Sequence, residues 1–236
     1  MPRTRPAVYV ALTPHGFGHA ARTLAILTIL RQRWPEVRLI LATTTPQWLL
    51  AANLPGEFTH RPVALDVGVV QTDGITQDLA QTRTALANLQ AQRDTLITQE
   101  AALIRQEEVQ LVFGDVPALA VAIAQAAGRP CWMASNFGWD FIYKDWGPEF
   151  EAVTAQMRMD YGQCNRLFRL PFHEEMTHFP RIEDVGLTAG RPRHSLREIR
   201  ETWGLTVEPA RTVLLAFGGL GLQGVPYARL AAYPDW

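Results

Sequence analysis

The sequence predicts an α/β fold in which helices cover both faces of a parallel sheet. Short apolar runs alternate with helical segments along most of the chain, as in repeated strand–helix–strand units. The strand runs are apolar almost throughout, which is typical of strands buried on both faces. Residues 8–12 also lead through a glycine-rich turn directly into a helix, the order that opens a Rossmann-like sheet. We therefore expect a Rossmann-like domain.

The expected elements follow one another at short intervals. The expected strands occupy residues 8–12, 38–42, 58–63, 110–114, 130–135 and 166–170. The expected helices occupy residues 20–33, 46–52, 78–107, 117–127 and 148–162. The segment 78–107 contains no Gly or Pro and places its leucines at helical intervals, so we expect one long amphipathic helix there.

A change of composition near residue 189 predicts a domain boundary. Residues 189–193 combine Gly, Pro and Arg, which is typical of a linker, and residues 195–203 have the signature of a capped helix that ends at Gly204. Residues 212–217 then form another apolar run that leads into glycines. We expect an N-terminal Rossmann-like domain at 1–188, a linker and helix at 189–211, and at 212–236 the beginning of an incomplete second Rossmann-like domain.

The composition narrows the classes of partner. The 236-residue chain is 47% hydrophobic and 19% charged, and its net charge of -1 does not attract polyanions, so we expect no nucleic-acid partner. The two cysteines fit neither a disulfide framework nor a metal knuckle, which predicts a reducing, cytoplasmic location. The sequence contains no run of about 18 apolar residues, so we expect no membrane-spanning helix. Peripheral membrane contact and the oligomeric state stay open.

The stretch from Pro14 to Arg22 allows several interpretations. Residues 16–21 match the dinucleotide-binding pattern G-x-G-x-x-A, but the second strand ends in threonines at 43–45 with no acidic residue for a ribose, which disfavours NAD or FAD. The sequence has no G-x-x-x-x-G-K-[ST] pattern for a nucleoside triphosphate. A tight turn without a ligand and a loop that presents a catalytic histidine both stay open.

A histidine base is the interpretation that the sequence favours. His19 lies at an expected helix start, where the helix dipole disfavours the charged ring, and a neutral imidazole accepts a proton at physiological pH. A carboxylate fixes the tautomer of such a base. Asp115, at the end of a buried strand, is the first candidate, and its alternative role is the N-cap of the following helix. Asp140 is the second candidate. His15 and His19 lack a third zinc ligand nearby, and no motif requires a metal or cofactor.

Several strings resemble one family of enzymes. Residues 13–30 resemble the first loop and helix of GT-B glycosyltransferases. A closer resemblance, at residues 15–22, 65–71, 135–143 and 214–219, is to glycosyltransferase-like proteins whose domain is also fused ahead of the sugar kinase in plant arabinokinase. The resemblance implies two Rossmann-like domains that face a cleft, with the acceptor held mainly by the first and a nucleotide-sugar donor mainly by the second.

The resemblance also implies roles for particular residues. His19 matches the base that deprotonates an acceptor hydroxyl, and Asp115 matches the acid that orients it. The other substrate-binding candidates are His15, Gly16, Phe17, Gly18, Asn136, Trp139 and Asp140. The glycines of the second domain that match a loop near the donor phosphates are Gly218, Gly219 and Gly221.

Three hypotheses about function follow. The first is an inverting glycosyltransferase, or its acceptor-binding part, that transfers a sugar, a hexose in our expectation, from a nucleotide-sugar donor such as a UDP-sugar. The second is a non-catalytic sugar or nucleotide-sugar binding module, which the incomplete donor domain favours. The third is a truncated piece without activity of its own. The donor nucleotide, the sugar and the acceptor are not specified by the sequence.

Overall fold

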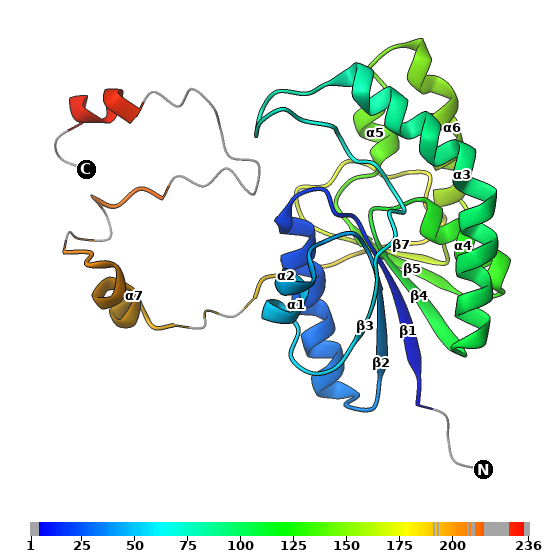
Figure 1. Cartoon of the computed structure of the whole chain (residues 1–236), viewed down its shortest axis with the longest axis horizontal. Helices are drawn as coiled ribbons and strands as arrows, with labels where there is room; N and C mark the ends of the chain where they lie inside the picture. Colours follow the sequence, from blue (N-terminus) through cyan, green and yellow to red (C-terminus); the bar gives the residue numbers. More distant parts are fainter. Residues whose placement is uncertain are drawn as a thin grey trace.

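Seven parallel strands form one sheet in the order β3-β2-β1-β4-β5-β6-β7 (Figure 1). The structure is a computed structural model, and it describes residues 5–190, 192, 194–206, 208, 211–214 and 227–233. The strands are β1 (Ala7–Leu12), β2 (Arg38–Ala42), β3 (Thr59–Arg61), β4 (Val109–Asp115), β5 (Cys131–Ser135), β6 (Arg166–Arg169) and β7 (Ile182–Asp184). The Rossmann-like α/β fold expected from the sequence is confirmed.

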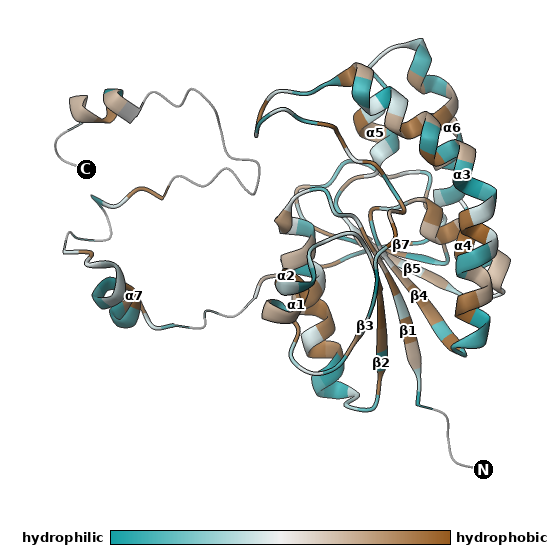
Figure 2. Cartoon of the chain, viewed as in Figure 1, coloured by the Kyte–Doolittle hydropathy of each residue, from teal (hydrophilic) through white to brown (hydrophobic). Residues whose placement is uncertain are grey.

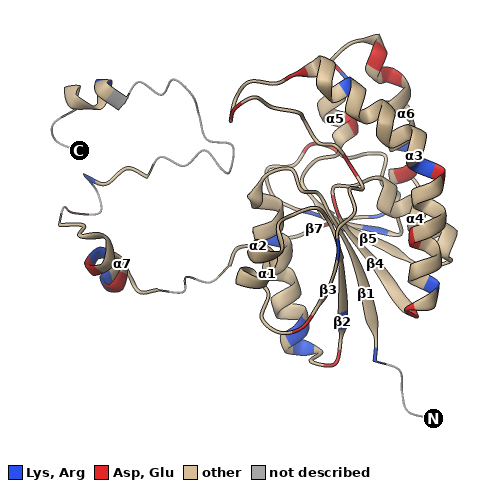
Figure 3. Ribbon diagram, viewed as in Figure 1, with Lys and Arg blue, Asp and Glu red and all other residues tan. Residues whose placement is uncertain are grey.

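Helices cover both faces of this sheet (Figure 1). The helices of the described residues are α1 (Phe17–Arg33), α2 (Gln47–Asn53), α3 (Leu79–Gln106), α4 (Leu119–Ala127), α5 (Trp139–Tyr143), α6 (Glu151–Tyr161) and α7 (Leu196–Trp203), with 3-10 helices η1 (Pro148–Phe150) and η4 (Tyr227–Ala232). Of these, α7 and η4 lie away from the sheet (Figure 1). None of the described helices is long and apolar enough to cross a membrane. The strands β1 and β2 and the helix α4 are largely apolar (Figure 2). Acidic and basic positions are interspersed along α7 (Figure 3).

Alternate residues of β1 build two separate cores. Val8, Val10 and Leu12 pack with the buried leucines of α1 and α2 on one face of the sheet. Ala7 and Tyr9 pack on the other face with α3 and α4. All six residues of β1 are buried, because a central parallel strand contributes side chains to both faces in turn.

A buried glutamate, paired with a partly exposed arginine, anchors the long helix α3 to the sheet. Glu100 is fully buried within α3 and accepts a hydrogen bond from the Tyr9 hydroxyl at 2.9 Å. Arg61, at the end of β3, donates to the same carboxylate at 2.7 Å. Burial and the neighbouring Glu100 raise the pKa of Tyr9 far above its ordinary value, so this hydroxyl remains a donor. The contact ties α3, β1 and β3 together.

The strand order places a switch point between β1 and β4. From β1 the chain moves outward to β2 and β3, and it then returns to the other side of β1 to form β4. The carboxyl ends of β1 and β4 are in register at Leu12 and Asp115, and the Thr13 amide donates to the Asp115 carbonyl at 3.2 Å. Ligands of open α/β sheets bind in the crevice at such a point.

Most expected elements occur within three residues of their expected bounds. The differences are α5 and β7, which the sequence did not indicate, the short β3, and a helix α1 that begins at Phe17 and not at residue 20. The capping box of α7 is confirmed at Ser195 and Glu198, and Gly204 ends the helix in the left-handed conformation. The proposed domain boundaries stay predictions, since most of 212–236, including Gly218, Gly219 and Gly221, lies outside the described residues.

Candidate active site at the carboxyl edge of the sheet

The loop after β1 brings His19 to the switch point. Gly16 has φ +76° and forms the N-cap of α1, so the chain turns sharply between β1 and the helix. Because α1 begins at Phe17, His19 lies in its first turn. Gly18 is helical, and a Cβ there would meet no atom within 4 Å. The loop therefore places the His19 ring beside the end of β4.

His19 and Asp115 form a contact between α1 and β4. His19 Nδ1 lies 3.1 Å from Asp115 Oδ1, and the two side chains are 14% and 1% exposed. Burial raises the pKa of the Asp115 carboxyl, but hydrogen bonds from Arg22 and His19 outweigh burial and hold the pKa below its ordinary value. An ionised carboxylate only accepts hydrogen bonds, so Nδ1 must be the donor. In the neutral ring, Nε2 is then the nitrogen that can accept a proton.

Asp115 also receives three hydrogen bonds from side chains that the sequence analysis did not select. Arg22 donates from Nε to Oδ2 at 2.7 Å and from Nη2 to Oδ1 at 2.5 Å, which is a bidentate pair. The Thr23 hydroxyl donates to Oδ2 at 2.6 Å. Arg22 and Thr23 stand three and four residues after His19, so they share one helix face with it. This spacing is the signal that would have found them.

The alternative role of Asp115 as an N-cap is wrong. The N-cap of α4 is Ala118, and no side chain caps this helix. The Asp115 carboxylate instead faces α1, where its donors lie. Asn136, expected near a substrate, is connected to Asp115 through Arg22, because Arg22 Nη1 donates to the Asn136 Oδ1 at 2.7 Å. Arg22 thus joins the loops after β4 and β5.

Backbone strain accompanies this carboxylate. Val116, the residue after Asp115, has φ +77°, a conformation that is rare for a β-branched side chain. Such outliers cost about 1–3 kcal/mol and persist where the surroundings over-determine them. The Tyr161 hydroxyl, from the end of α6, donates to the Val116 carbonyl at 2.7 Å and fixes this peptide.

His15 lies against the loop after β3. The Val69 amide lies 3.4 Å from its Nδ1, and the edge of the Trp139 ring contacts it at a centroid distance of 5.2 Å. Burial, and then the nearby His19, lower the pKa of His15. His15 and His19 therefore lie at the same edge of the sheet, but His15 contacts Val69 and Trp139, whereas His19 contacts Asp115.

Asp66 is a second buried carboxylate at this edge, and the sequence analysis did not select it as a site residue. It accepts a hydrogen bond from the Trp139 indole at 2.7 Å, and its Oδ1 has no hydrogen-bond partner among the described residues. Burial raises its pKa to about 6, against the opposing effect of the Trp139 hydrogen bond. The signal in the sequence is an acidic residue directly after a buried leucine, beyond a strand end.

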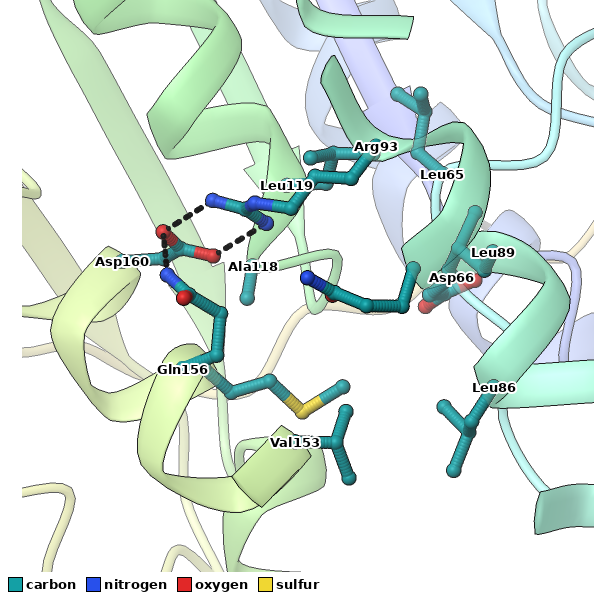
Figure 4. A pocket seen from close by; sticks show the side chains of 12 residues that line it. Leu65, Asp66, Leu86, Leu89, Arg93, Ala118, Leu119, Val153, Gln156 and Asp160 are labelled. Atoms are coloured by element: carbon teal, nitrogen blue, oxygen red, sulfur yellow. Dashed lines mark hydrogen bonds and ion pairs between the residues drawn. The ribbon is translucent and has the colours of Figure 1, made fainter. Parts of the chain in front are cut away.

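A small cavity lies on the far side of Asp66, between α3, α4 and α6 (Figure 4). Its volume of about 30 Å³ is enough for one water molecule. Arg93 and Asp160 form a bidentate pair in its wall, with N···O distances of 2.9 and 2.7 Å. Apolar side chains supply most of the remaining wall (Figure 4).

The remaining candidates are placed differently from one another. Phe17 is 38% exposed and contacts Trp48 edge to face. Trp139 is only 2% exposed, so its ring contacts His15 and does not face solvent. Asp140 pairs with Arg158 at 3.2 Å and lies 3.5 Å from His178, so it belongs to a separate cluster and does not contact His19. Within the described part of the chain, no three His, Cys, Asp or Glu residues converge on a metal position.

Comparison with solved structures defines the class of fold. The chain is similar to Arabidopsis thaliana UGT89C1 complexed with UDP-L-rhamnose, with a TM-score of 0.60 and 14% identity over 97% of this chain and 62% of that one. It is also similar to the glycosyltransferase of kitacinnamycin, with a TM-score of 0.59 and 15% identity over 98% of this chain and 64% of that one. The fold is thus the one found in GT-B glycosyltransferases, as expected.

Comparison with curated proteins gives a particular relative. The chain is 31% identical to L-arabinokinase of Arabidopsis thaliana over 225 residues, which is 90% of this chain and 21% of that protein. The chain therefore spans about a fifth of the curated relative that it matches. No family model matches the chain. The resemblance that the sequence strings indicated is confirmed by both comparisons.

Proposed function

We propose that this chain is the acceptor-binding part of an inverting glycosyltransferase that uses a nucleotide-sugar donor. The observation that supports this most directly is the contact of His19 Nδ1 with the buried, ionised Asp115 at 3.1 Å. It leaves Nε2 as the accepting nitrogen of a neutral imidazole, at the switch point where α/β sheets bind ligands.

In the proposed step, His19 Nε2 takes the proton of an acceptor hydroxyl. The hydroxyl oxygen forms a bond to the anomeric carbon of the donor sugar, and the bond from that carbon to the nucleoside diphosphate breaks on the opposite side. The diphosphate leaves with the electron pair, and the anomeric configuration inverts. Asp115 stabilises the imidazolium that forms, as the carboxylate of a catalytic triad does. Gly218, Gly219 and Gly221 are the proposed donor-phosphate loop on the strength of the family resemblance.

The two cysteines support a reducing location for this activity. Cys131 and Cys164 are both buried and free, although Cys164 Sγ lies only 3.4 Å from the Cys131 carbonyl. Neighbouring cysteines that stay unpaired are typical of a compartment that keeps thiols reduced. We therefore propose a cytoplasmic protein.

A non-catalytic sugar or nucleotide-sugar binding module is the second candidate, and Arg22 favours it. The guanidinium is bonded to both Asp115 oxygens, so it neutralises most of the charge that would otherwise stabilise an imidazolium at His19. An orienting acid paired in this way supports a base less strongly than a free carboxylate does. In a binding module the same network would only hold the loops in place.

The deciding experiment uses the protein that carries this sequence. It is incubated with a panel of UDP-sugars and hydroxyl acceptors, and both UDP release and product are measured. His19→Ala should lower the transfer rate by about 10²- to 10⁴-fold, the usual contribution of a general base. His60→Ala is the matched control, since His60 bonds the Thr43 carbonyl at 3.0 Å, away from Asp115. Full activity of His19→Ala would exclude the base; saturable binding without turnover would favour the second candidate.

A further inference from the structure

A hollow of about 320 Å³ opens beside His15, between the loops after β1 and β3. Its wall includes Phe17, Val67, Val69 and Gln71. None of the described residues in the wall is acidic, and none is a Lys or Arg. A phosphate or carboxylate would find no counter-charge here, so the chemistry of the wall suits an uncharged ligand that has both polar and apolar surface.

His15 lines this hollow, and its hydrogen bond defines which ring nitrogen carries a proton. The Val69 N–H donates to its Nδ1 at 3.4 Å, and a nitrogen that accepts this bond holds no proton. In the neutral ring the proton is therefore on Nε2. Burial lowers the pKa of His15 and so favours the neutral ring. The two histidines of this edge are in opposite tautomers, because the Nδ1 of His19 donates to Asp115.

The position of the His15 ring depends on a glycine. Gly68 has φ +65°, and a Cβ at this position would lie 2.7 Å from two atoms of the His15 ring. The His15 ring also makes a T-shaped contact with Trp139, which is itself held by its hydrogen bond to Asp66. Gly68, the Val69 N–H and Trp139 therefore all restrict the orientation of the His15 ring. A histidine that only contributes to a protein surface does not need this many constraints.

Exposed aromatic rings stand beside this donor. Phe17, in the wall of the hollow, is 38% exposed, and Trp48 is 64% exposed. Their ring centroids are 6.0 Å apart at an interplanar angle of 85°, so Trp48 holds the orientation of Phe17. An apolar acceptor would need an enclosed apolar pocket. An open hollow whose largely apolar wall contains one aromatic ring and the polar side chains of His15 and Gln71 instead fits a sugar, which has polar edges and an apolar face.

We propose that this hollow binds a carbohydrate acceptor, with His15 donating its Nε2–H to a sugar oxygen and Phe17 lying against an apolar face of the sugar. The inference rests on the proposed function and adds the substrate class. His19 would take the proton of the reacting hydroxyl, and His15 would hold a second oxygen of the same sugar. His15 is then a specificity-determining residue and not a base.

The test is long-range ¹H–¹⁵N spectroscopy of the histidine-labelled 236-residue chain at pH 7. We expect the Nε2–H tautomer at His15 and the Nδ1–H tautomer at His19. Methyl galactoside and methyl arabinoside are the carbohydrate probes, 4-nitrophenol is the apolar hydroxyl probe, and inorganic phosphate is the anion probe. A saturable shift of His15 with a glycoside alone supports the inference. The Nδ1–H tautomer at His15, no shift with either glycoside, or tighter binding of 4-nitrophenol or phosphate would overturn it.

Two glycine variants separate ring placement from backbone strain. Gly68→Ala displaces the His15 ring, whereas Gly128→Ala imposes the same strain at φ +68° where a Cβ meets nothing within 4 Å. Gly68→Ala, like His15→Phe, should weaken glycoside binding by about fivefold to tenfold, the typical value of one neutral hydrogen bond. Gly128→Ala should leave binding unchanged. Equal binding by all three variants and the parent would remove His15 from the site.

This binding test requires neither a nucleotide-sugar donor nor turnover. Its result can therefore contradict the carbohydrate site without contradicting the proposed function. If the protein that carries this sequence transfers sugar to a non-carbohydrate hydroxyl while both glycosides leave His15 unmoved, the proposed function stands and the inference is wrong. If glycosides bind at His15 but His19→Ala leaves the transfer rate unchanged, the base is wrong and the carbohydrate site stands.

Discussion

The loops after β4 and β3 each bury one carboxylate, and the two carboxylates respond to burial in opposite ways. Asp115 is 1% exposed and accepts hydrogen bonds from Arg22, Thr23 and His19. Asp66 is 5% exposed; the Trp139 indole donates to it at 2.7 Å, and hydrogen bonding from Trp139 and Thr13 does not offset its burial. The pKa of Asp115 lies below its ordinary value, whereas that of Asp66 is raised to about 6. Because the two carboxylates are buried to nearly the same extent, their hydrogen-bond donors decide which of them stays ionised.

This difference gives the two carboxylates different roles at the same edge of the sheet. A carboxylate that stays ionised can orient a histidine and compensate a positive charge. A carboxylate with few partners is costly to ionise, and here it fixes an aromatic ring under His15. Each loop is also held by a buried tyrosine, Tyr161 at Val116 and Tyr143 at Gly68. The following predictions alter one loop and use the other as its control.

Removal of the guanidinium should have the largest effect on stability. Arg22→Met leaves Asp115 buried with its best donor lost, and we expect the free energy of unfolding to fall by about 3–5 kcal/mol in urea denaturation at pH 7. Arg93→Met is the matched control, because the Arg93 and Asp160 side chains are 16% and 8% exposed, against 17% and 1% for Arg22 and Asp115. Both variants should lose stability, but only Arg22→Met should change the His19 ¹⁵N signals. An Arg22→Met chain as stable as the parent would contradict the pairing.

The second prediction concerns pH. Burial raises the pKa of Asp66 in the folded chain from 3.8 to about 6. Because the folded state then binds the proton more tightly than the unfolded state, the free energy of unfolding falls as pH rises between these values. Asp66→Asn keeps an acceptor for Trp139 and removes this loss. Relative to the parent, it should gain about 2–3 kcal/mol of unfolding free energy between pH 4 and pH 8.

Asp115→Asn is the control for the sign of this effect. The lowered pKa of Asp115 gives stability that is present above its ordinary pKa and is lost as pH falls, so this variant should be most harmful near neutrality and least harmful in acid. Parallel pH profiles for the two variants would show that the two loops do not differ in the way described.

The third prediction compares the two tyrosine contacts. Tyr161→Phe and Tyr143→Phe each leave a buried carbonyl without its donor, and each should cost about 1–2 kcal/mol in thermal unfolding. Tyr161→Phe also removes the acceptor of a weak bond from the Trp139 amide at 3.4 Å. Their local effects should differ. Amide exchange at Val69, which donates to His15, should accelerate in Tyr143→Phe and remain unchanged in Tyr161→Phe. Acceleration in both variants would mean that the loops move together.

The smallest effect is expected at Asn136. Asn136→Ala removes the hydrogen bond from Arg22 Nη1 at 2.7 Å but leaves the bidentate pair with Asp115 intact. We expect a loss of about 1 kcal/mol in urea denaturation, with no change in the tautomer of His19. A larger loss, or a changed His19 signal, would show that Asn136 positions Arg22 for the dyad.

The sequence predicted the sheet well because its signals are local. The apolar run at 8–12, the Gly-free segment 78–107 and the glycine after 127 depend on periodicity and capping, and each corresponds to an element of the structure. The pairing of His19 with Asp115 was also predictable, since parallel strands bring their carboxyl ends to one edge. Arg22 and Asp66 carry signals in the sequence that mark them as candidates, but those signals do not show which side chains they meet after folding.

The anchoring of α3 at mid-helix limits how the crevice can respond to a ligand. A slide of this helix by one turn, about 5.4 Å, would separate Glu100 from Arg61 and Tyr9 and leave a charge alone in the core. Adjustment around a ligand must therefore come from the segments that follow β1, β3 and β4, while α3 serves as a fixed reference against which those segments move.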